Sequence, residues 1–369
     1  MTELVEYLAA TIAGERSAAE ALEAMPLDDV REAARIHGVL PLVAHRLGEL
    51  KASPRLLSVL NEEAHRLAPS DLLKGHELRL CLDALGRAGI PVLLMKGGQL
   101  AYSHYERPDL RPRLDSDILI QVEARSRVDR VLVDCGYTAE AQLPGELVMY
   151  QATYTKRRQS ALIHALDVHW RIANPQVFGG ILSFDELSAE AVQVPGLGPS
   201  ARGLAPAHAL LLACIHRVAH HFDSGYLLWL YDIHLVASRM DRSEWTHFVD
   251  LAQARGVTAV CSHGLRQAIQ CFGTSVPPEV MATFSQARQS PVEAATAAYL
   301  TKRRHVENIV ADIRALPTWS SRARLLLEHA FPPARYMRNV YAPSSHLPLP
   351  VLYAQRAVRG ARKWFGRAA

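Results

Sequence analysis

Apolar residues recur at helical spacing through the first 88 positions of the chain. The segments LDDVREAARIHGVLPLVAHRL and SDLLKGHELRLCLDALGRAG place them three and four residues apart, and the second segment ends at Gly89. A short continuous apolar run, IPVLLM at 90–95, follows and indicates a buried strand. The pattern therefore predicts a helical N-terminal lobe whose last helix leads into a sheet.

The pattern then alternates between strand and helix up to position 172. Five elements follow the first strand: a short helix ended by Pro108, an alternating strand RLDSDILIQV, a helix ended by Gly136, and two antiparallel strands. Their predicted ranges are 98–106, 113–122, 124–137, 145–156 and 160–172. This order indicates a mixed α/β core of about 110 residues.

The segment VPGLGPSARGLAP at 194–206 is rich in glycine and proline and is the best candidate for a domain boundary. Helical periodicity returns after it and continues to the end of the chain. We therefore expect an α+β fold with three parts: an N-terminal helical lobe at 1–75, an α/β core at 76–198 and a C-terminal helical domain at 199–369.

Composition narrows the class of protein. The chain has 369 residues, 49% of them hydrophobic and 21% charged, which is typical of a folded globular protein. With 41 basic and 37 acidic residues the net charge is only +4, so nucleic acid is not an expected partner.

Five widely spaced cysteines without a CxxC pair indicate buried thiols in a reducing compartment. The N-terminus lacks the basic start of a signal peptide, and no apolar run is long enough for a membrane span, so we expect a cytoplasmic protein.

Two aspartates in the alternating strand are the first candidates for chemistry. Asp115 and Asp117 fall on one face of that strand, about 7 Å apart, with Ser116 and Ile118 on the other face. Carboxylates this close repel each other unless a cation lies between them, and Mg²⁺ is the hard ion that suits them. The alternative interpretation is a polar strand edge that faces solvent.

Two further features point toward a nucleotide. Lys96, Gly97 and Gly98 lie between a strand and a helix, where glycines allow a phosphate to approach the backbone, although such turns also use glycine for packing. In ALDVHWR, Asp167 and His169 share one face of a later strand. Asp167 could bring a third carboxylate to the metal. His169 could lie behind the metal ligands, contact an acceptor or pack against Trp170.

This ordered series resembles an uncharacterised bacterial nucleotidyltransferase family of the polymerase-beta-like nucleotidyltransferase superfamily. The segments that carry the resemblance are LLMKGGQLAYSHYERPDLRPRLDSDILI, LDVHWRI and LLACIHRVAHHF...LLWLYDIHLV, within roughly residues 20–340. The resemblance implies a nucleotidyltransferase-type sheet and transfer of an NMP from an NTP to a hydroxyl acceptor, with release of pyrophosphate.

The resemblance also implies roles for the candidate residues. Asp115, Asp117 and Asp167 would hold two Mg²⁺ ions, with Mn²⁺ as the alternative ion. The Lys96–Gly98 turn would lie beside the phosphates, and Arg111 or Arg113 would balance their charge. ATP is weakly favoured among the nucleotides, and the acceptor would be a small molecule, a peptide or a protein. The rival hypothesis is a non-catalytic nucleotide-binding or interaction protein that retains the fold.

Two other groups stay open at this level. His216 and His220 lie four residues apart on one helical face, a spacing that suits zinc, helix packing or the lining of a cleft. The segment LYAQRAVRGARKWFGRAA at 352–369 is predicted as a basic amphipathic helix, which would cover the protein's own surface or contact an acidic one.

Overall fold

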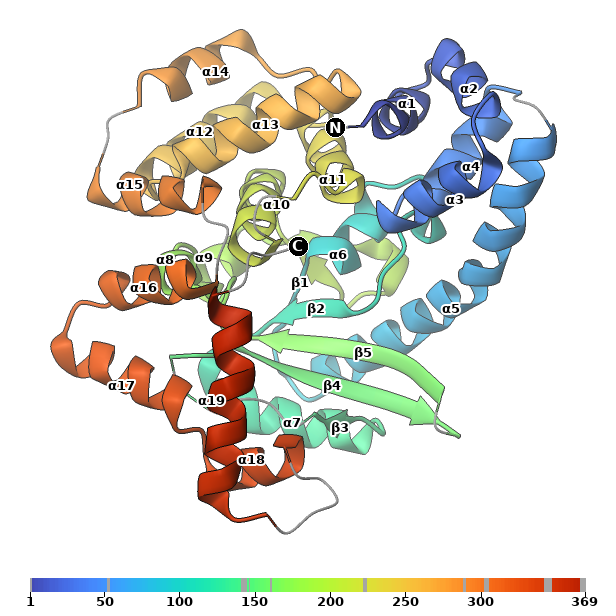
Figure 1. Cartoon of the computed structure of the whole chain (residues 1–369). Coiled ribbons are helices and arrows are strands. Elements are labelled where there is room, and N and C mark those ends of the chain that lie inside the picture. The colour runs from blue at the N-terminus through green and yellow to red at the C-terminus, as the bar shows by residue number, and fades with distance from the viewer. Residues whose placement is uncertain are drawn as a thin grey trace.

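A seven-stranded mixed sheet lies at the centre of the protein, and helices surround it (Figure 1). The structure is a computed structural model. It describes residues 2–51, 54–140, 145, 147–159, 161–221, 224–287, 290–301, 305–341 and 347–365. The predicted α+β class is confirmed.

The N-terminal lobe consists of helices whose apolar faces pack together. Its elements are α1 (Glu3–Ile12), α2 (Arg16–Glu23), α3 (Leu27–Ile36), α4 (Leu40–Glu49) and α5 (Pro54–Arg87). Helix α5 has 34 residues and runs from the lobe along the sheet, as Figure 1 shows. The domain boundary predicted at residue 75 falls inside this helix, and the division into domains stays a prediction.

The sheet has the order β3-β4-β5-β2-β1-β7-β6. Its strands are β1 (Leu93–Met95), β2 (Ser116–Leu119), β3 (Thr138–Ala139), β4 (Gln151–Arg158), β5 (Ala161–His169), β6 (Val192–Gln193) and β7 (Arg202–Gly203). The central pair β2 and β5 is parallel, whereas β4 and β5 form an antiparallel hairpin. The hairpin and the two central strands were predicted, but each is shorter than its alternating or apolar run.

Three strands of two residues each were not predicted. One of them, β7, comes from the Gly- and Pro-rich segment at 194–206 and pairs in parallel with β1. Two residues are too few to show a period, so these strands depend on the sheet edge that they extend.

Helices also alternate with the strands through the core. They are α6 (Lys96–Ser103), α7 (Arg125–Asp134), α8 (Gln176–Gly179) and α9 (Phe184–Ala189), with 3₁₀ turns η1 (Pro108–Leu110), η2 (Val122–Ala124) and η3 (Pro195–Leu197). Side-chain alternation divides the sheet into two faces. Leu94, Ile118 and Leu166 belong to a core with residues of α5 and α7, whereas Leu93, Met95 and Leu119 belong to the larger core of the helical parts.

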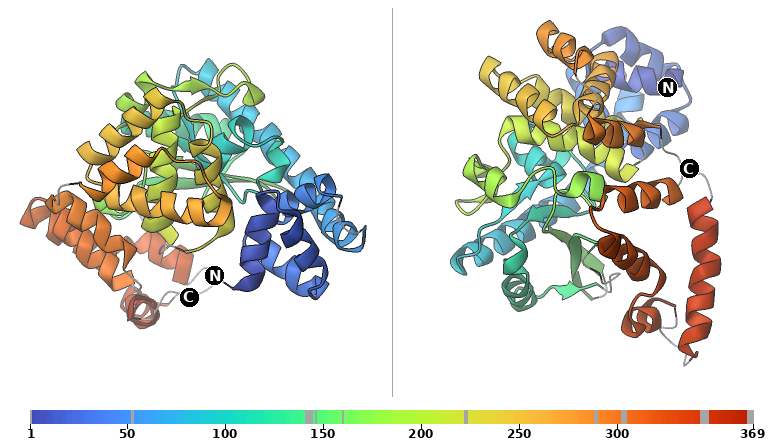
Figure 2. Two further views of the ribbon diagram at one scale, coloured as in Figure 1. Left: turned by 90° about the horizontal axis from the view of Figure 1, so that it is seen from above. Right: turned by 90° about the vertical axis from the view of Figure 1, so that its left-hand side faces the viewer.

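The C-terminal part is helical, as predicted. It contains α10 (Pro206–His221), α11 (Leu227–Ala237), α12 (Arg242–Ala254), α13 (Thr258–Phe272), α14 (Pro278–Ser285), α15 (Pro291–Ala297), η4 (Ala298–Leu300), α16 (His305–Ala315), α17 (Trp319–Ala330), α18 (Ala334–Tyr341) and α19 (Leu349–Phe365). The two views of Figure 2 show α16 to α19 as a group apart from α10 to α14. Met337 and Leu352 form a small core of their own in this group.

Two further expectations concern cysteines and the C-terminal helix. All five cysteines are free thiols, but only three are buried, and Cys135 and Cys271 are half-buried, so the prediction of buried thiols is right for three of the five. The predicted basic helix corresponds to α19, where Arg356 donates to the backbone oxygen of His329 at 2.9 Å and so contacts the protein's own surface. Residues 366–369 of that prediction lie outside the described part of the chain. Within the described part, we find no helix with the length and apolar character that crossing a membrane requires.

Candidate active site

Two carboxylates face each other across the central parallel strands. Asp117 of β2 pairs in register with Asp167 of β5, and His169 follows on the same face of β5. The ligand atoms of Asp117, Asp167 and His169 all lie within 4.8 Å of one another. The strand register therefore brings together the two aspartates that the sequence places 50 residues apart.

Asp117 is buried and has two close partners. Lys96 donates from Nζ to Oδ1 at 2.6 Å, and His169 Nε2 lies 2.8 Å from the same oxygen. Burial alone would raise the pKa of the Asp117 carboxyl, but the Lys96 charge and the His169 hydrogen bond outweigh it and hold that pKa well below its usual range. Asp117 is therefore ionised at neutral pH.

Asp167 accepts hydrogen bonds from the neighbouring strand β4. Gln151 Nε2 donates to it at 2.8 Å and Thr153 Oγ1 at 2.7 Å. Burial, opposed by the Thr153 hydrogen bond and reinforced by the nearby Asp117 charge, raises the pKa of Asp167. Gln151 and Thr153 orient this carboxylate, and sequence reasoning did not identify either residue.

Asp115 lies one residue before β2 and is exposed. The protein around its carboxyl and the charges of Asp117 and Asp167 raise its pKa to about 6. Its ligand atoms are not part of the group within 4.8 Å, so Asp115 lies at the rim of the pair. Ser116 points to the opposite face, where its hydroxyl is 3.0 Å from His164 Nε2, as the alternation predicts.

The segment at residues 96–98 differs from the predicted turn. Helix α6 begins at Lys96, immediately after β1, so both glycines belong to its first turn and the expected start at 98 is wrong. The residue with the left-handed backbone is Lys96 itself, with φ of +51°, a conformation that costs roughly 1 kcal/mol or more in a residue other than glycine. This backbone directs the Lys96 side chain toward Asp117.

Gly97 is required by a close neighbour. A Cβ atom there would lie 2.4 Å from Arg111 Nη1 and 2.6 Å from Arg111 Cζ. At Gly98 the nearest atom would be the Asp117 backbone nitrogen at 3.7 Å, an ordinary contact. Packing against Arg111 therefore explains the first glycine.

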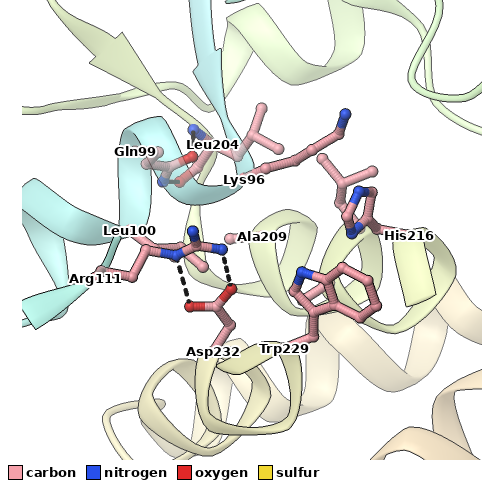
Figure 3. Close-up of a pocket in the computed structure, with 11 residues that line it drawn as sticks. Lys96, Gln99, Leu100, Arg111, Leu204, Ala209, His216, Trp229 and Asp232 are labelled. Carbon is pink, nitrogen blue, oxygen red and sulfur yellow. Dashed lines mark hydrogen bonds and ion pairs between the residues drawn. The ribbon is translucent and has the colours of Figure 1, made fainter. Parts of the chain in front are cut away.

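Arg111 forms a buried ion pair with Asp232 of α11 (Figure 3). Nη2 donates to Oδ2 at 2.6 Å and Nε to Oδ1 at 3.1 Å, and the Tyr105 hydroxyl donates to Oδ1 at 2.8 Å. The two residues line a cavity of about 20 Å³, enough for roughly one water molecule, together with Lys96, His216 and Trp229. Arg111 therefore joins the segment before β2 to the helical domain.

Arg113 lies elsewhere. Its guanidinium is buried 5.2 Å from the Tyr102 ring centroid, and its three nitrogens have no hydrogen-bond partner in the described part of the protein. After burial, the Arg113 charge is the largest influence that lowers the pKa of His164, the partner of Ser116. These contacts place Arg113 beside residues of the sheet face opposite to Asp117.

Aromatic rings form a wall on the helical side of the carboxylates. On α10, His216 has its ring centroid 5.7 Å from that of Trp229, and His221 stacks on the same tryptophan at 3.8 Å. Burial, and next the Lys96 charge, lower the pKa of His220 to about 3 and that of His221 to about 4. The wall is therefore uncharged at neutral pH. No three-ligand metal group found in the described residues includes His216 or His220.

A larger cleft of about 1040 Å³ begins beside this wall. His220 lines it on one side, and residues of α16 to α19 form the other side. Tyr336, Tyr341, Arg356 and Arg359 are among the latter, with Arg359 over the Tyr341 ring at 5.7 Å. The cleft thus combines aromatic and cationic groups, and His220 links it to the wall.

A comparison with protein families gives a match over most of the chain. A family described as an uncharacterised nucleotidyltransferase matches residues 24–273, about two thirds of the chain. No curated protein matches the chain. The matched segment contains Lys96, Asp117, Asp167, His169 and the Arg111–Asp232 pair. The chain therefore belongs to this nucleotidyltransferase family.

Proposed function

We propose that the protein transfers an NMP from an NTP to a hydroxyl acceptor, releases pyrophosphate and depends on a divalent metal. The observation that carries the proposal is the pair Asp117 and Asp167, side by side on adjacent strands, with His169 next to Asp167 on the same face of β5. Hard oxygen donors of this kind suit Mg²⁺, and Mn²⁺ is the alternative ion.

The donor set fits such an ion because its carboxylates outnumber the cations beside them. Desolvation by the surrounding protein raises the pKa values of Asp115 and Asp167, and repulsion by the neighbouring carboxylates raises them further. These three residues would hold the metal, with Asp115 at the rim. Mg²⁺ bound there would supply positive charge to the phosphates and lower the pKa of the acceptor hydroxyl.

The chain's own groups would orient the reactants. Lys96 Nζ projects from the first turn of α6, where backbone N–H groups are available to an anion, so it would contact a nucleotide phosphate. Asp167, with its raised pKa and the orienting hydrogen bond from Thr153, would accept the proton of the attacking hydroxyl. Catalysis would then consist of positioning and charge stabilisation, without a covalent enzyme intermediate.

We infer that the acceptor occupies the cleft between α10 and α16–α19. His220 belongs both to the aromatic wall and to the lining of the cleft, and the far side of the cleft lies beyond residue 273, where the family match ends. Tyr341 and Arg359 would suit an acceptor with a planar or anionic group. The part of the chain that the family model covers would then carry out the transfer, and the C-terminal helices would select the acceptor.

One observation favours the rival, non-catalytic nucleotide-binding function. Lys96 Nζ lies 2.6 Å from Asp117 Oδ1 and already supplies a positive charge where the metal would bind. In that case nucleotide binding would not depend on Mg²⁺.

Calorimetry with the four NTPs distinguishes the two functions. We would titrate ATP, GTP, CTP and UTP with and without Mg²⁺ into the parent, an Asp117→Asn/Asp167→Asn variant and an Asp185→Asn control. Asp185 is an aspartate outside the site that accepts from Gln121. The proposal requires binding that needs Mg²⁺, vanishes in the double variant and persists in the control. Binding independent of Mg²⁺ supports the rival, and no binding by the folded parent contradicts both.

A further inference from the structure

A second group of side chains that could bind a metal shares no residue with the proposed active site. Glu190 caps the C-terminal end of α9, His208 is in the first turn of α10, and His247 is in α12. Their ligand atoms lie within 4.8 Å of one another. Three separate elements therefore converge on one point at the start of α10.

The distances within this group suit a shared ion better than direct hydrogen bonds. Glu190 Oε2 lies 3.4 Å from His247 Nδ1 and 3.9 Å from His208 Nδ1. Two ligands at about 2.1 Å from a tetrahedral zinc ion are about 3.4 Å apart. The two histidine rings meet edge to face with centroids 5.3 Å apart, so they do not stack over the gap. Small side-chain movements would bring all three groups to one ion.

His208 gives an independent reason to expect a ligand. Its side chain is 0% exposed, and neither ring nitrogen has a hydrogen-bond partner in the described part of the protein. A buried polar group without a partner is costly, and such groups are rare in folded proteins. Burial also lowers the pKa of His208, which keeps the imidazole in the neutral form that binds metals.

The surroundings leave the Glu190 carboxylate available to a cation. The charge of Arg255 acts on His208, but this guanidinium is paired with Glu186 at 2.8 Å. Glu190 is 46% exposed and His247 37%, so an ion could reach the group from solvent. The positive end of α10 disfavours a cation, and the carboxylate offsets this effect.

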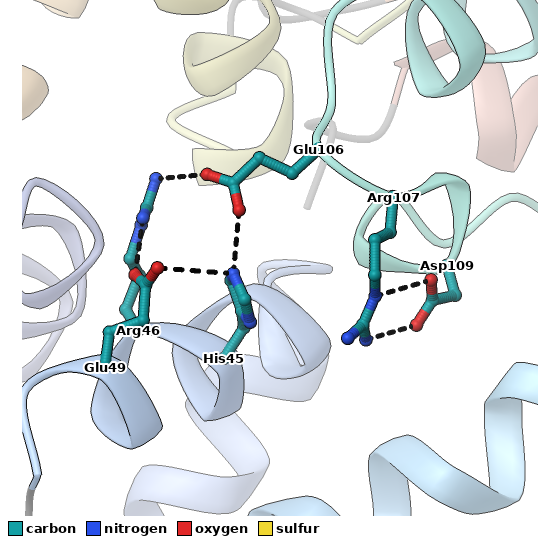
Figure 4. A network of polar contacts seen from close by, with 6 residues as sticks. All are labelled: His45, Arg46, Glu49, Glu106, Arg107 and Asp109. Carbon is teal, nitrogen blue, oxygen red and sulfur yellow. Dashed lines mark hydrogen bonds and ion pairs between the residues drawn. The ribbon is translucent and has the colours of Figure 1, made fainter.

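A similar set of residues in the N-terminal lobe shows the contrast (Figure 4). There His45 Nε2 is 2.9 Å from a Glu106 oxygen, and Arg46 pairs with both Glu49 and Glu106. Its carboxylates are neutralised by Arg46, and its histidine already has a partner. This network needs no ion.

We propose that Glu190, His208 and His247 bind a divalent transition-metal ion of the zinc type. Two imidazoles and one carboxylate are a common zinc ligand set, with water at the fourth position. The ion would tie α10 to α12 and to the segment that enters β6. Because His216 and His220 lie 8 and 12 residues further along α10, the ion would also fix the helix that forms the wall of the active site.

Zn²⁺ titration of chelator-treated protein tests this site. The variants are Glu190→Gln and Glu190→Gln/His247→Asn, which alter exposed side chains, with His45→Asn as the matched control. The Asp117→Asn/Asp167→Asn variant separates this ion from any Zn²⁺ at the other carboxylates. Circular dichroism without metal verifies that each variant is folded.

We expect one Zn²⁺ to remain bound in the Asp117→Asn/Asp167→Asn variant and in the control. Its affinity should fall at least about tenfold in Glu190→Gln and further in the double variant. With Co²⁺, visible absorption typical of a four-coordinate ion should appear in the parent and be lost in the double variant. A folded parent that binds no Zn²⁺, or Zn²⁺ binding that Glu190→Gln/His247→Asn leaves unchanged, would overturn the proposal. Neither result depends on nucleotide binding.

Discussion

Asp115 and Asp117 are two residues apart, yet the pKa values of their carboxyl groups shift in opposite directions. Lys96 and His169 hold the pKa of Asp117 low, whereas desolvation by the surrounding protein and the charges of Asp117 and Asp167 raise the pKa of Asp115 to about 6. Asp115 and Asp167 are therefore the groups whose charge is least compensated. This imbalance is the electrostatic reason to expect a cation beside them.

Asp115→Asn should stabilise the metal-free protein at neutral pH. The folded-state pKa of about 6 exceeds the ordinary value of 3.8, so the ionised carboxylate opposes folding above pH 6 and has no effect well below pH 4. For a fully buried group the difference would be about 3 kcal/mol, and the exposure of Asp115 reduces it to about 1 kcal/mol. Urea unfolding at pH 7.5 and pH 5 should show a gain that shrinks as the pH falls.

The same substitution should weaken Mg²⁺-dependent nucleotide binding, so the two effects have opposite signs. Asp185→Asn serves as the control, because that carboxylate lies away from the pair. A variant that is no more stable than the parent at pH 7.5 would show that the ionised Asp115 carboxylate does not destabilise the folded protein.

The segment before β2 and helix α11 show how elements far apart in sequence hold the site. Alternation predicted that Asp115 and Asp117 share one face of their strand and that Asp167 and His169 share one face of theirs. The parallel register of β2 and β5 brings Asp117 and Asp167 together. The partner of Arg111 could not be predicted, because Asp232 is 121 residues away on a helix whose position depends on packing. Sequence reasoning placed Arg111 beside the phosphates, and the structure pairs it with Asp232. Whether it also contacts a nucleotide stays a prediction.

The two adjacent glycines of α6 should respond differently to alanine. Gly97→Ala would place a methyl group against the Arg111 guanidinium, which cannot move away easily because Asp232 holds it. We expect a loss of about 1–3 kcal/mol in the free energy of unfolding. Gly98→Ala meets only ordinary contacts and gains helix propensity, so it should be neutral or stabilising by up to about 1 kcal/mol.

Chemical unfolding of both variants measures this difference, and each serves as the other's control. Equal losses at the two positions would show that the space beside Arg111 does not decide which glycine is needed.

For the whole molecule, the predicted order of helical lobe, mixed core and helical domain is confirmed. The residues that join these parts were harder to foresee. Glu190, His208 and His247 come from three elements, and no spacing relates them. The cleft near His220 depends on how α16 to α19 lie against the core, which periodicity within a helix does not determine.

The arrangement predicts that nucleotide and acceptor binding can be separated by truncation. Helices α18 and α19 have their own small core around Met337 and Leu352, and α17 contacts the rest of the protein through the hydrogen bond from Leu147 N to Glu328 at 2.9 Å, among other contacts. A chain that ends at residue 316 should therefore keep the main core. It should bind NTP and Mg²⁺ within about threefold of the parent, a difference of about 0.6 kcal/mol.

Calorimetry and thermal unfolding compare the truncated chain with the full one. The truncation removes Tyr341 and Arg359 from the cleft, so transfer to an acceptor should be lost while nucleotide binding persists. The loss of nucleotide binding in a folded truncated chain would instead place α17 to α19 in the nucleotide site. The cleft would then hold the base or sugar of the NTP, and the acceptor would have to approach the carboxylates from the side of Asp115.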